Sequence, residues 1–214
     1  GHDPLYAPQS KEDSDIFNRF QLNGIKFKQT WGGCVYHMTC RGSRRNTVDK
    51  AKNIYEDSPE WLAQNQRSSR NFIRKWGHFV KHDSLMKPII PSKYDIGIVL
   101  DNNNTQLLHM LEPWCNTIYC GVGVNLVKQY ITNEQPNTII DLSKKVLPFN
   151  NEKNNEILIT IGNKFDQQDF GYIQQLPEIL ADSGEPGFHG ELGNLTIYVK
   201  TMDTYENDLI ICKK

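Results

Sequence analysis

Short apolar runs, each bounded by turn-forming residues, recur along this chain. Runs of this length, rich in β-branched and aromatic residues, are typical of β-strands. Many short strands with no helical period between them favour a sandwich or a barrel, so the pattern predicts an all-β protein. The expected strands are Ile25–Phe27, Val35–Met38, Phe72–Val80, Ile96–Leu100, Thr117–Val124, Ile157–Ile161 and Leu195–Val199.

Two segments depart from the strand pattern. Pro59–Asn65 follows Ser58, a residue that commonly caps helix N-termini, and Thr204–Cys212 lies near the end of the chain. We expect a helix in each. Residues 1–15 are polar and end in a charged run, and we expect them to form a flexible lead or a retained propeptide. The folded domain is then expected to span residues 16–214.

Composition narrows the range of partners. A chain of 214 residues can form one sizeable domain or two small lobes. Its net charge of -1 predicts no strong electrostatic field for nucleic acid or for an anionic membrane. No apolar run has the length of a membrane span. We therefore expect neither nucleic acid nor membrane as a partner, and the sequence indicates no metal site and no cofactor.

Cysteine and asparagine positions bear on the compartment. The chain has five cysteines, Cys34, Cys40, Cys115, Cys120 and Cys212, so at most two intramolecular disulfides can form and at least one thiol stays free or pairs with another molecule. Asn103 and Asn194 each begin an N-glycosylation pattern, Asn-x-Thr. These patterns favour a secreted, extracellular protein, and the disulfide pairing stays open.

A resemblance to trypsin-like serine proteases rests first on two segments. Ala181-Asp182-Ser183-Gly184-Glu185-Pro186 resembles Gly-Asp-Ser-Gly-Gly-Pro, the loop that carries the catalytic serine. Asp95-Ile96-Gly97-Ile98-Val99-Leu100 resembles the strand that begins with the aspartate of the triad. Ser183 and Asp95 match the family in their order and in their approximate separation along the chain.

The third segment of that resemblance has lost the histidine. Thr47-Val48-Asp49-Lys50-Ala51-Lys52-Asn53-Ile54 occupies the place of Thr-Val-Leu-Thr-Ala-Ala-His-Cys, so Asn53 stands where the general base is expected. Imidazole serves as that base because its pKa lies near neutrality, and a carboxamide has no usable titration. The resemblance therefore implies an inactive protein with the degenerate triad positions Asn53, Asp95 and Ser183.

Other positions of the implied site are also altered. Ala181 would place a Cβ in the oxyanion-hole turn, where the family has glycine. Pro177 would lie at the floor of the specificity pocket and, on one register, Val199 would lie at its wall. A rival register matches Ile197-Tyr198-Val199-Lys200 to a later strand of the family instead. Cys40 would lose its usual disulfide partner, because Ile54 replaces it. An extended substrate should not fit such a cleft.

The chain most resembles the scabies-mite inactivated serine protease paralogues, which are relatives of the group 3 mite allergens. The resemblance implies two packed six-stranded antiparallel β-barrels with a boundary near residues 105–120, and a short C-terminal helix. It implies a secreted pseudoprotease that binds host proteins, among them complement components, through its surface. Two alternatives stay open: an active serine protease with an unusual base or a different histidine register that still uses Ser183 and Asp95, and a β domain unrelated to proteases.

Overall fold

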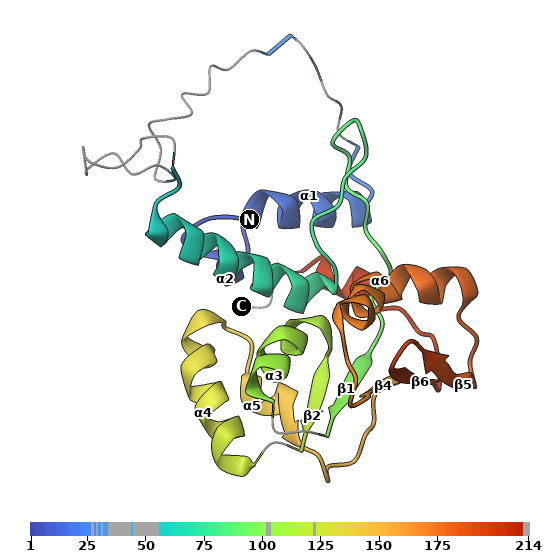
Figure 1. Cartoon of the computed structure of the whole chain (residues 1–214). Coiled ribbons are helices and arrows are strands. Elements are labelled where there is room, and N and C mark those ends of the chain that lie inside the picture. Colours follow the sequence, from blue (N-terminus) through green and yellow to red (C-terminus); the bar gives the residue numbers. More distant parts are fainter. Residues whose placement is uncertain are drawn as a thin grey trace.

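The computed structural model describes residues 1–26, 28, 30, 32, 33, 44, 56–101, 104–121 and 123–211. Helices alternate with strands, and one mixed sheet lies at the centre of the fold (Figure 1). The α-helices are α1 (Glu12–Leu22), α2 (Pro59–Trp76), α3 (Thr105–Leu111), α4 (Val124–Glu134), α5 (Leu142–Lys145) and α6 (Gln167–Ser183). The 3-10 helices are η1 (Pro4–Tyr6), η2 (Glu112–Trp114), η3 (Gln135–Asn137) and η4 (Glu206–Leu209).

The sheet has six strands in the order β3-β2-β1-β4-β6-β5. The strands β3, β2, β1 and β4 run parallel, β6 pairs antiparallel with β4, and β5 forms an antiparallel hairpin with β6. Their bounds are β1 (Ile96–Leu100), β2 (Thr117–Cys120), β3 (Val146–Pro148), β4 (Ile157–Ile161), β5 (His189–Leu192) and β6 (Leu195–Val199).

The prediction of an all-β protein with two antiparallel barrels is wrong. Parallel neighbours need crossover connections, and helices supply them here: α3 connects β1 to β2, and α4 with α5 connects β2 to β3. A lobe boundary near residues 105–120 would run through α3 and β2, which belong to one sheet and its covering layer. The fold is therefore an α/β fold.

The strand predictions succeed where apolar residues are flanked by turns. Ile96–Leu100, Ile157–Ile161 and Leu195–Val199 are strands with the predicted bounds. The strand expected at Thr117–Val124 ends at Cys120, and Val124 begins α4. Phe72–Val80 is not a strand, since Phe72 to Trp76 form the end of α2.

Both helix predictions were right in place, but one was too short and the other too long. The helix expected at Pro59–Asn65 is confirmed and continues to Trp76 as α2. Ser58 accepts a hydrogen bond from the Trp61 amide (3.2 Å), and Gly77, with φ of 80°, ends the helix in the left-handed conformation. The expected C-terminal helix is present only as η4 among the described residues.

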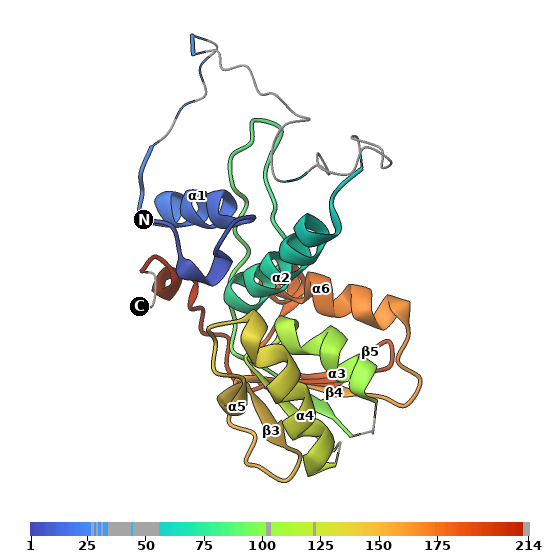
Figure 2. The ribbon, with the colours of Figure 1, turned by 90° about the vertical axis from the view of Figure 1, so that its left-hand side faces the viewer.

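The main core lies on one face of the sheet. Alternate residues of β4 and β6 point to this face, while β1 is buried along its whole length, as is usual for a central parallel strand. Helices α3, α4 and α6 pack against it with Leu108, Leu111, Val127, Ile173, Leu176 and Leu180. Figure 2 shows α3 and α4 together in front of the strands. Burial of this apolar surface is the main source of stability for the sheet.

The opposite face is covered in part by the loop before β4. Asn155 in this loop accepts a hydrogen bond from the buried Tyr119 hydroxyl (2.7 Å) and donates one to Asp95 (2.7 Å). A Cβ at Gly97 would lie 2.5 Å from Asn155 Oδ1, so the close approach of the loop requires glycine there. Asn155 is thus a buried part of this loop, although the neighbouring Asn150, Asn151 and Asn154 are exposed.

A layer of buried charges joins α2 to the rest of the fold. Arg74 donates to Glu112 (2.6 Å) and to Glu134 (2.5 Å), and Arg70 binds the same two carboxylates. Burial by itself raises the pKa of Glu112, but the charges of Lys145, Arg74 and Arg70 together lower it to about 2. Glu112 is therefore ionised at neutral pH and holds α2 against η2 and α4.

The first residues are packed rather than flexible. Leu5 and Tyr6 of η1 form a second apolar cluster with Phe72 and Trp76 of α2. Asp15, which is fully buried in α1, accepts hydrogen bonds from Arg19, Lys75, Trp76 and Tyr6. The polar sequence of residues 1–15 does not indicate this packing, because the side chains that contact these residues belong to α2, far along the chain.

Candidate functional site

Asp95 and Ser183, two positions of the predicted protease triad, make local structural hydrogen bonds. Asp95 precedes β1 and accepts a hydrogen bond from Asn155, while Ser183 is the last residue of α6, where its hydroxyl donates to the Ile179 carbonyl (3.0 Å). Asn53 lies outside the described residues. The hydrogen bonds of Asp95 and Ser183 therefore give no sign of a shared site.

The other predicted cleft positions belong to regular elements. Ala181 and Pro177 are part of α6, and Val199 is buried at the end of β6. A helix cannot form the turn that an oxyanion hole needs, since its amides donate along the helix axis. The resemblance of residues 181–186 to a protease loop is thus a resemblance of sequence alone.

The remaining candidate residues can be placed only in part. Asn194 lies in the β5–β6 turn, where its side-chain nitrogen donates to Asp169 (2.9 Å). A glycan would attach to that nitrogen. Cys115 and Cys120 are free and buried, and burial raises the pKa of each thiol to about 12. Asn103, Cys34, Cys40 and Cys212 lie outside the described residues.

A hairpin after α2 forms a more promising surface. His82 and Pro88 pair across it, and the Ile89 amide donates to the Lys81 carbonyl (3.0 Å). Asp83 fixes its tip, because one carboxylate oxygen accepts from the amides of Leu85 (2.8 Å) and Lys87 (2.9 Å). The tip is therefore a defined turn.

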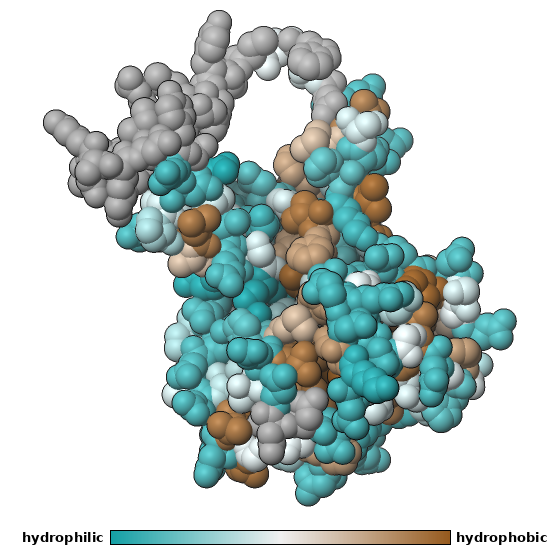
Figure 3. Space-filling view, in the orientation of Figure 1, coloured by the Kyte–Doolittle hydropathy of each residue, from teal (hydrophilic) through white to brown (hydrophobic). Residues whose placement is uncertain are grey.

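That turn holds two large apolar side chains in solvent. Leu85 is 68% exposed and Met86 is 61% exposed, and Met86 has a positive φ of 61°. A non-glycine residue in that conformation is uncommon, and strained residues of this kind often cluster at functional sites. Figure 3 shows apolar side chains following the hairpin on a largely hydrophilic surface. Such exposed apolar clusters commonly mark binding sites.

Helix α1 provides the facing wall. Figures 1 and 2 both place the hairpin beside α1, and Gln21 at the end of α1 donates to the Pro88 carbonyl (2.9 Å). The buried Asp15 anchors α1 to α2, so Ser14, Phe17 and Asn18 are held toward the hairpin. Both walls thus depend on contacts with α2.

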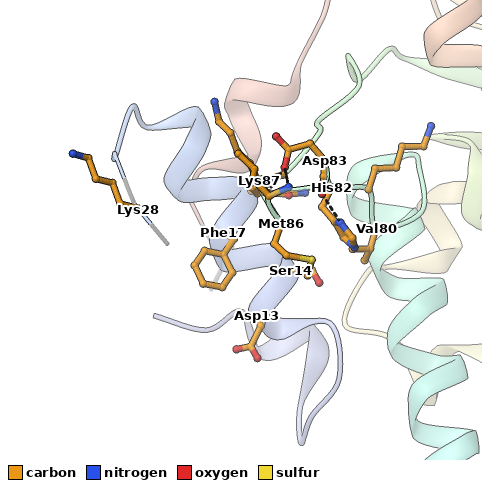
Figure 4. Close-up of a pocket in the computed structure, with 13 residues that line it drawn as sticks. Asp13, Ser14, Phe17, Lys28, Val80, His82, Asp83, Met86 and Lys87 are labelled. Atoms are coloured by element: carbon orange, nitrogen blue, oxygen red, sulfur yellow. Dashed lines mark hydrogen bonds between the residues drawn. The ribbon is translucent and has the colours of Figure 1, made fainter. Parts of the chain in front are cut away.

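Between the two walls lies a groove with a volume of about 840 Å³, here called the hairpin groove (Figure 4). In Figure 4, Met86 reaches from the hairpin toward Ser14 of α1. The volume is within the range typical of small-molecule sites. Its lining combines apolar side chains with a few polar ones: Asp13, Ser14, Phe17, Asn18, Lys28, Val80, Lys81, His82, Asp83, Leu85, Met86, Lys87 and Pro88.

One polar group of the groove lacks a hydrogen-bond partner. Asn18 is only 3% exposed, and its side-chain nitrogen has no acceptor within reach. A buried donor without an acceptor costs free energy, typically about 1 to 3 kcal/mol.

The base of the hairpin is held by a buried histidine, an aromatic contact and an ion pair. His78 is fully buried there, with one ring nitrogen 2.5 Å from the Phe79 carbonyl oxygen, and burial lowers the pKa of its imidazole to about 4. Phe79 packs edge-on against Trp114, with ring centroids 4.9 Å apart. Lys81 forms an ion pair with Glu178 of α6. These contacts fix the hairpin on the body of the fold.

A second region, at the carboxyl ends of the parallel strands, compares poorly with the groove. Ligands of open α/β sheets often bind where the strand order reverses, which is between β1 and β4 here. Asp101 follows β1 at this edge, and Gly162 to Lys164 line a hollow of about 270 Å³ beside the β5–β6 turn. The hairpin groove is larger and more apolar, which favours it as the ligand site.

Sequence reasoning missed the groove, although one signal was present. Leu85 and Met86 are adjacent apolar residues inside a turn that Asp83 and Pro88 delimit. Apolar residues at a turn are unusual unless they are covered or bind something. The facing wall could not be inferred, because α1 is far from the hairpin in sequence.

No protein-family model, curated protein or solved structure matches this chain. Within the described ranges, none of the helices has the length and apolar character needed to cross a bilayer. The same residues hold no group of three or more metal-binding side chains.

Proposed function

We propose that this protein binds an apolar ligand non-covalently in the hairpin groove. The observation that carries the proposal is the exposure of Leu85 and Met86 on a turn that Asp83 holds in place. Exposing these side chains to water is unfavourable, and covering them with a ligand recovers about 1.5 to 3 kcal/mol for each. A fixed turn also lowers the entropic cost of binding.

Two of the charged residues that line the groove already have structural partners. Lys81 is paired with Glu178, and Asp83 is bonded to the amides of its own turn. A general acid or base must reach a substrate proton with a free atom of suitable pKa. The binding of host complement proteins stays a prediction, and the double-barrel fold from which it was inferred is not the fold observed.

The proposal can be tested with N-phenyl-1-naphthylamine, an uncharged probe whose fluorescence rises in apolar surroundings. We expect saturable binding, with amide chemical-shift changes confined to α1 and the hairpin. Met86→Asn removes the apolar side chain and keeps a residue that tolerates positive φ. It should weaken probe binding about tenfold.

Ile139→Asn is the matched control, since Ile139 is 60% exposed and lies outside the groove. It should leave probe binding unchanged. Equal losses in both variants, or shift changes elsewhere in the fold, would show that the hairpin groove is not the binding site.

A further inference from the structure

We infer that the edge strand β5 pairs antiparallel with β5 of a second copy of this chain, so that two six-stranded sheets become one continuous sheet. The inference goes beyond the proposed function, because no residue of β5 lines the hairpin groove. It depends on three features of β5: its free backbone groups, its difference from the opposite edge of the sheet, and a sequence that is complementary to itself.

The outward side of β5 has backbone groups without a partner. The Val199 amide of β6 donates to the carbonyl of Phe188, just before β5 (2.9 Å). Alternate residues of an antiparallel strand bond to the same neighbour, so Phe188 and Gly190 face β6. The amides and carbonyls of His189 and Glu191 therefore face away from the sheet, and they form no hydrogen bond with any described residue. Such groups can extend a sheet by one more strand.

The opposite edge of the sheet is protected from such pairing. Strand β3 ends in Pro148, which has no amide to donate, and proline is one of the residues that protect edge strands. Strand β5 contains neither proline nor lysine, and Figure 1 shows it at the outer end of the sheet. Of the two edges, β5 is therefore the one open to another strand.

The sequence of β5 is complementary to itself in one register. When Gly190 lies opposite Gly190 of the second copy, His189 lies opposite Glu191 of that copy, and the two-fold symmetry repeats this pair. Each of the two pairs can exchange two backbone hydrogen bonds, because both of its residues face outward. This register thus uses all the free backbone groups of both strands.

The charges on the outer face of the sheet select the same register. The side chains of His189 and Glu191 are both exposed, and the His189 ring packs against Tyr198 with ring centroids 5.6 Å apart. An imidazole N–H can donate to the carboxylate opposite it. A shift by two residues in either direction would instead place Glu191 opposite Glu191, or His189 opposite His189. A charged residue normally protects an edge strand, but here it finds its complement in the second copy.

The other face of the pair is apolar. Phe188 is 46% exposed, and Leu192 packs at the margin of the main core. In the same register Phe188 lies opposite Leu192 of the second copy, so pairing removes apolar surface from water. The Phe188 ring lies over Gly190, where a Cβ would come within 2.6 Å of it. Glycine at the two-fold axis therefore leaves space for the rings of both copies.

The contact is small, so the dimer should be weak. Two paired strands of four residues compare with interfaces of about 1,200 Å² or more in stable complexes. We therefore expect a dimer that dissociates on dilution. Because the two-fold pairing uses the β5 edge of both copies, assembly should end at the dimer.

Sedimentation velocity of the full chain at about 1 to 500 μM tests this inference, and we expect a shift from monomer to dimer within that range. Amide hydrogen exchange at the same concentrations should identify the interface. It should slow at His189 and Glu191, whose amides gain acceptors, and stay unchanged in α1 and in the hairpin.

Exchange of charges tests the register. His189→Glu places like charges opposite each other in both pairs and should weaken the dimer about tenfold. Adding Glu191→Lys to this variant restores opposite charges and should restore the dimer. Thr160→Glu is the matched control, since it adds the same charge to an exposed residue of β4, which β6 separates from β5. It should leave the dimer unchanged.

The outcomes are distinct. Dimerisation with protection at His189 and Glu191, lost in the single variant and regained in the double variant, supports the inference. A chain that stays monomeric across the whole range overturns it, as does protection of other residues only. Equal losses for His189→Glu and Thr160→Glu would show that added charge, and not the register, decides association. Assembly beyond the dimer would contradict the two-fold pairing.

Discussion

Two buried layers hold this protein together, and they use opposite chemistry. The core between the sheet and helices α3, α4 and α6 is formed by aliphatic side chains. The layer between α2 and the body is formed by charges, with Arg74 and Glu112 fully buried and Lys145 3.4 Å from the same carboxylate. The stability of the apolar layer depends on close packing and on the buried area. The stability of the charged layer depends on each buried charge having a partner of opposite sign.

This difference matters for the groove. Both walls of the hairpin groove are attached to α2, one through Asp15 and the other through the hairpin that follows Trp76. The charged layer positions α2, so it also sets the distance between the walls. The apolar core, in contrast, supports the sheet and has no direct part in the groove.

Substitution of Glu112 should have the largest effect. Glu112→Gln keeps the shape of the side chain but removes one of the two carboxylates that pair with the buried Arg74 and with Arg70, so we expect a loss of about 3 to 5 kcal/mol in the free energy of unfolding. Urea denaturation measures this loss in the free energy of unfolding. Glu178→Gln is the control, because Glu178 is 41% exposed in its ion pair and should cost less than about 1 kcal/mol. Similar losses for the two variants would contradict the role of the charged layer.

The stability of the apolar core should depend on the volume of its side chains rather than on charge. Leu108 is fully buried in α3, and Leu108→Ala should cost about 2 to 5 kcal/mol because it leaves a cavity. Leu108→Met conserves volume and should cost less than about 1.5 kcal/mol. Urea denaturation of both variants tests whether shape alone governs this layer. A methionine variant as unstable as the alanine variant would show that it does not.

Acidification should weaken the hairpin base before it weakens the charged layer. The pKa of His78 is about 4 in the folded protein and about 6.5 when unfolded, so the folded state loses stability as the pH falls from 6.5 to 4, by about 3 kcal/mol in all. The pKa of Glu112 is about 2, below its ordinary 4.5, so its contribution is lost only as the pH falls from 4.5 to 2.

The free energy of unfolding measured from about pH 7 down to about pH 2 would resolve these two steps. His78→Phe should remove the loss between pH 6.5 and 4, because no buried imidazole is left to protonate. An unchanged pH profile in this variant would assign the loss to another group.

Leu85 should have the smallest effect on stability. Its side chain is 68% exposed, so Leu85→Ser should change the free energy of unfolding by less than about 0.5 kcal/mol. The same substitution should weaken N-phenyl-1-naphthylamine binding. A large loss of stability would mean that the tip packs on the fold, and that its exposure has no functional meaning.

The sequence by itself determined the local elements whose signals are short-range. Ser58 and Pro59 mark the start of α2 by capping chemistry, which acts within a few residues, whereas its end at Gly77 was not predicted. The strands at 96–100, 157–161 and 195–199 follow from apolar runs between turns. The turn at Asp83 likewise depends on hydrogen bonds to residues two and four positions further along.

Only the tertiary structure decided how these elements are combined. Whether β1 pairs parallel with β2 depends on α3, a helix whose seven residues gave no distinct period. Residues 181–183 were predicted to form a loop, yet they are the last residues of α6. The helix is stabilised because Ile173, Leu176 and Leu180 pack on the apolar face of the sheet. The partners of Asp15 and Glu112 lie up to 61 residues away, and no local pattern can indicate them. The groove exists for the same reason, since its two walls come from α1 and from a hairpin that long-range contacts bring beside it.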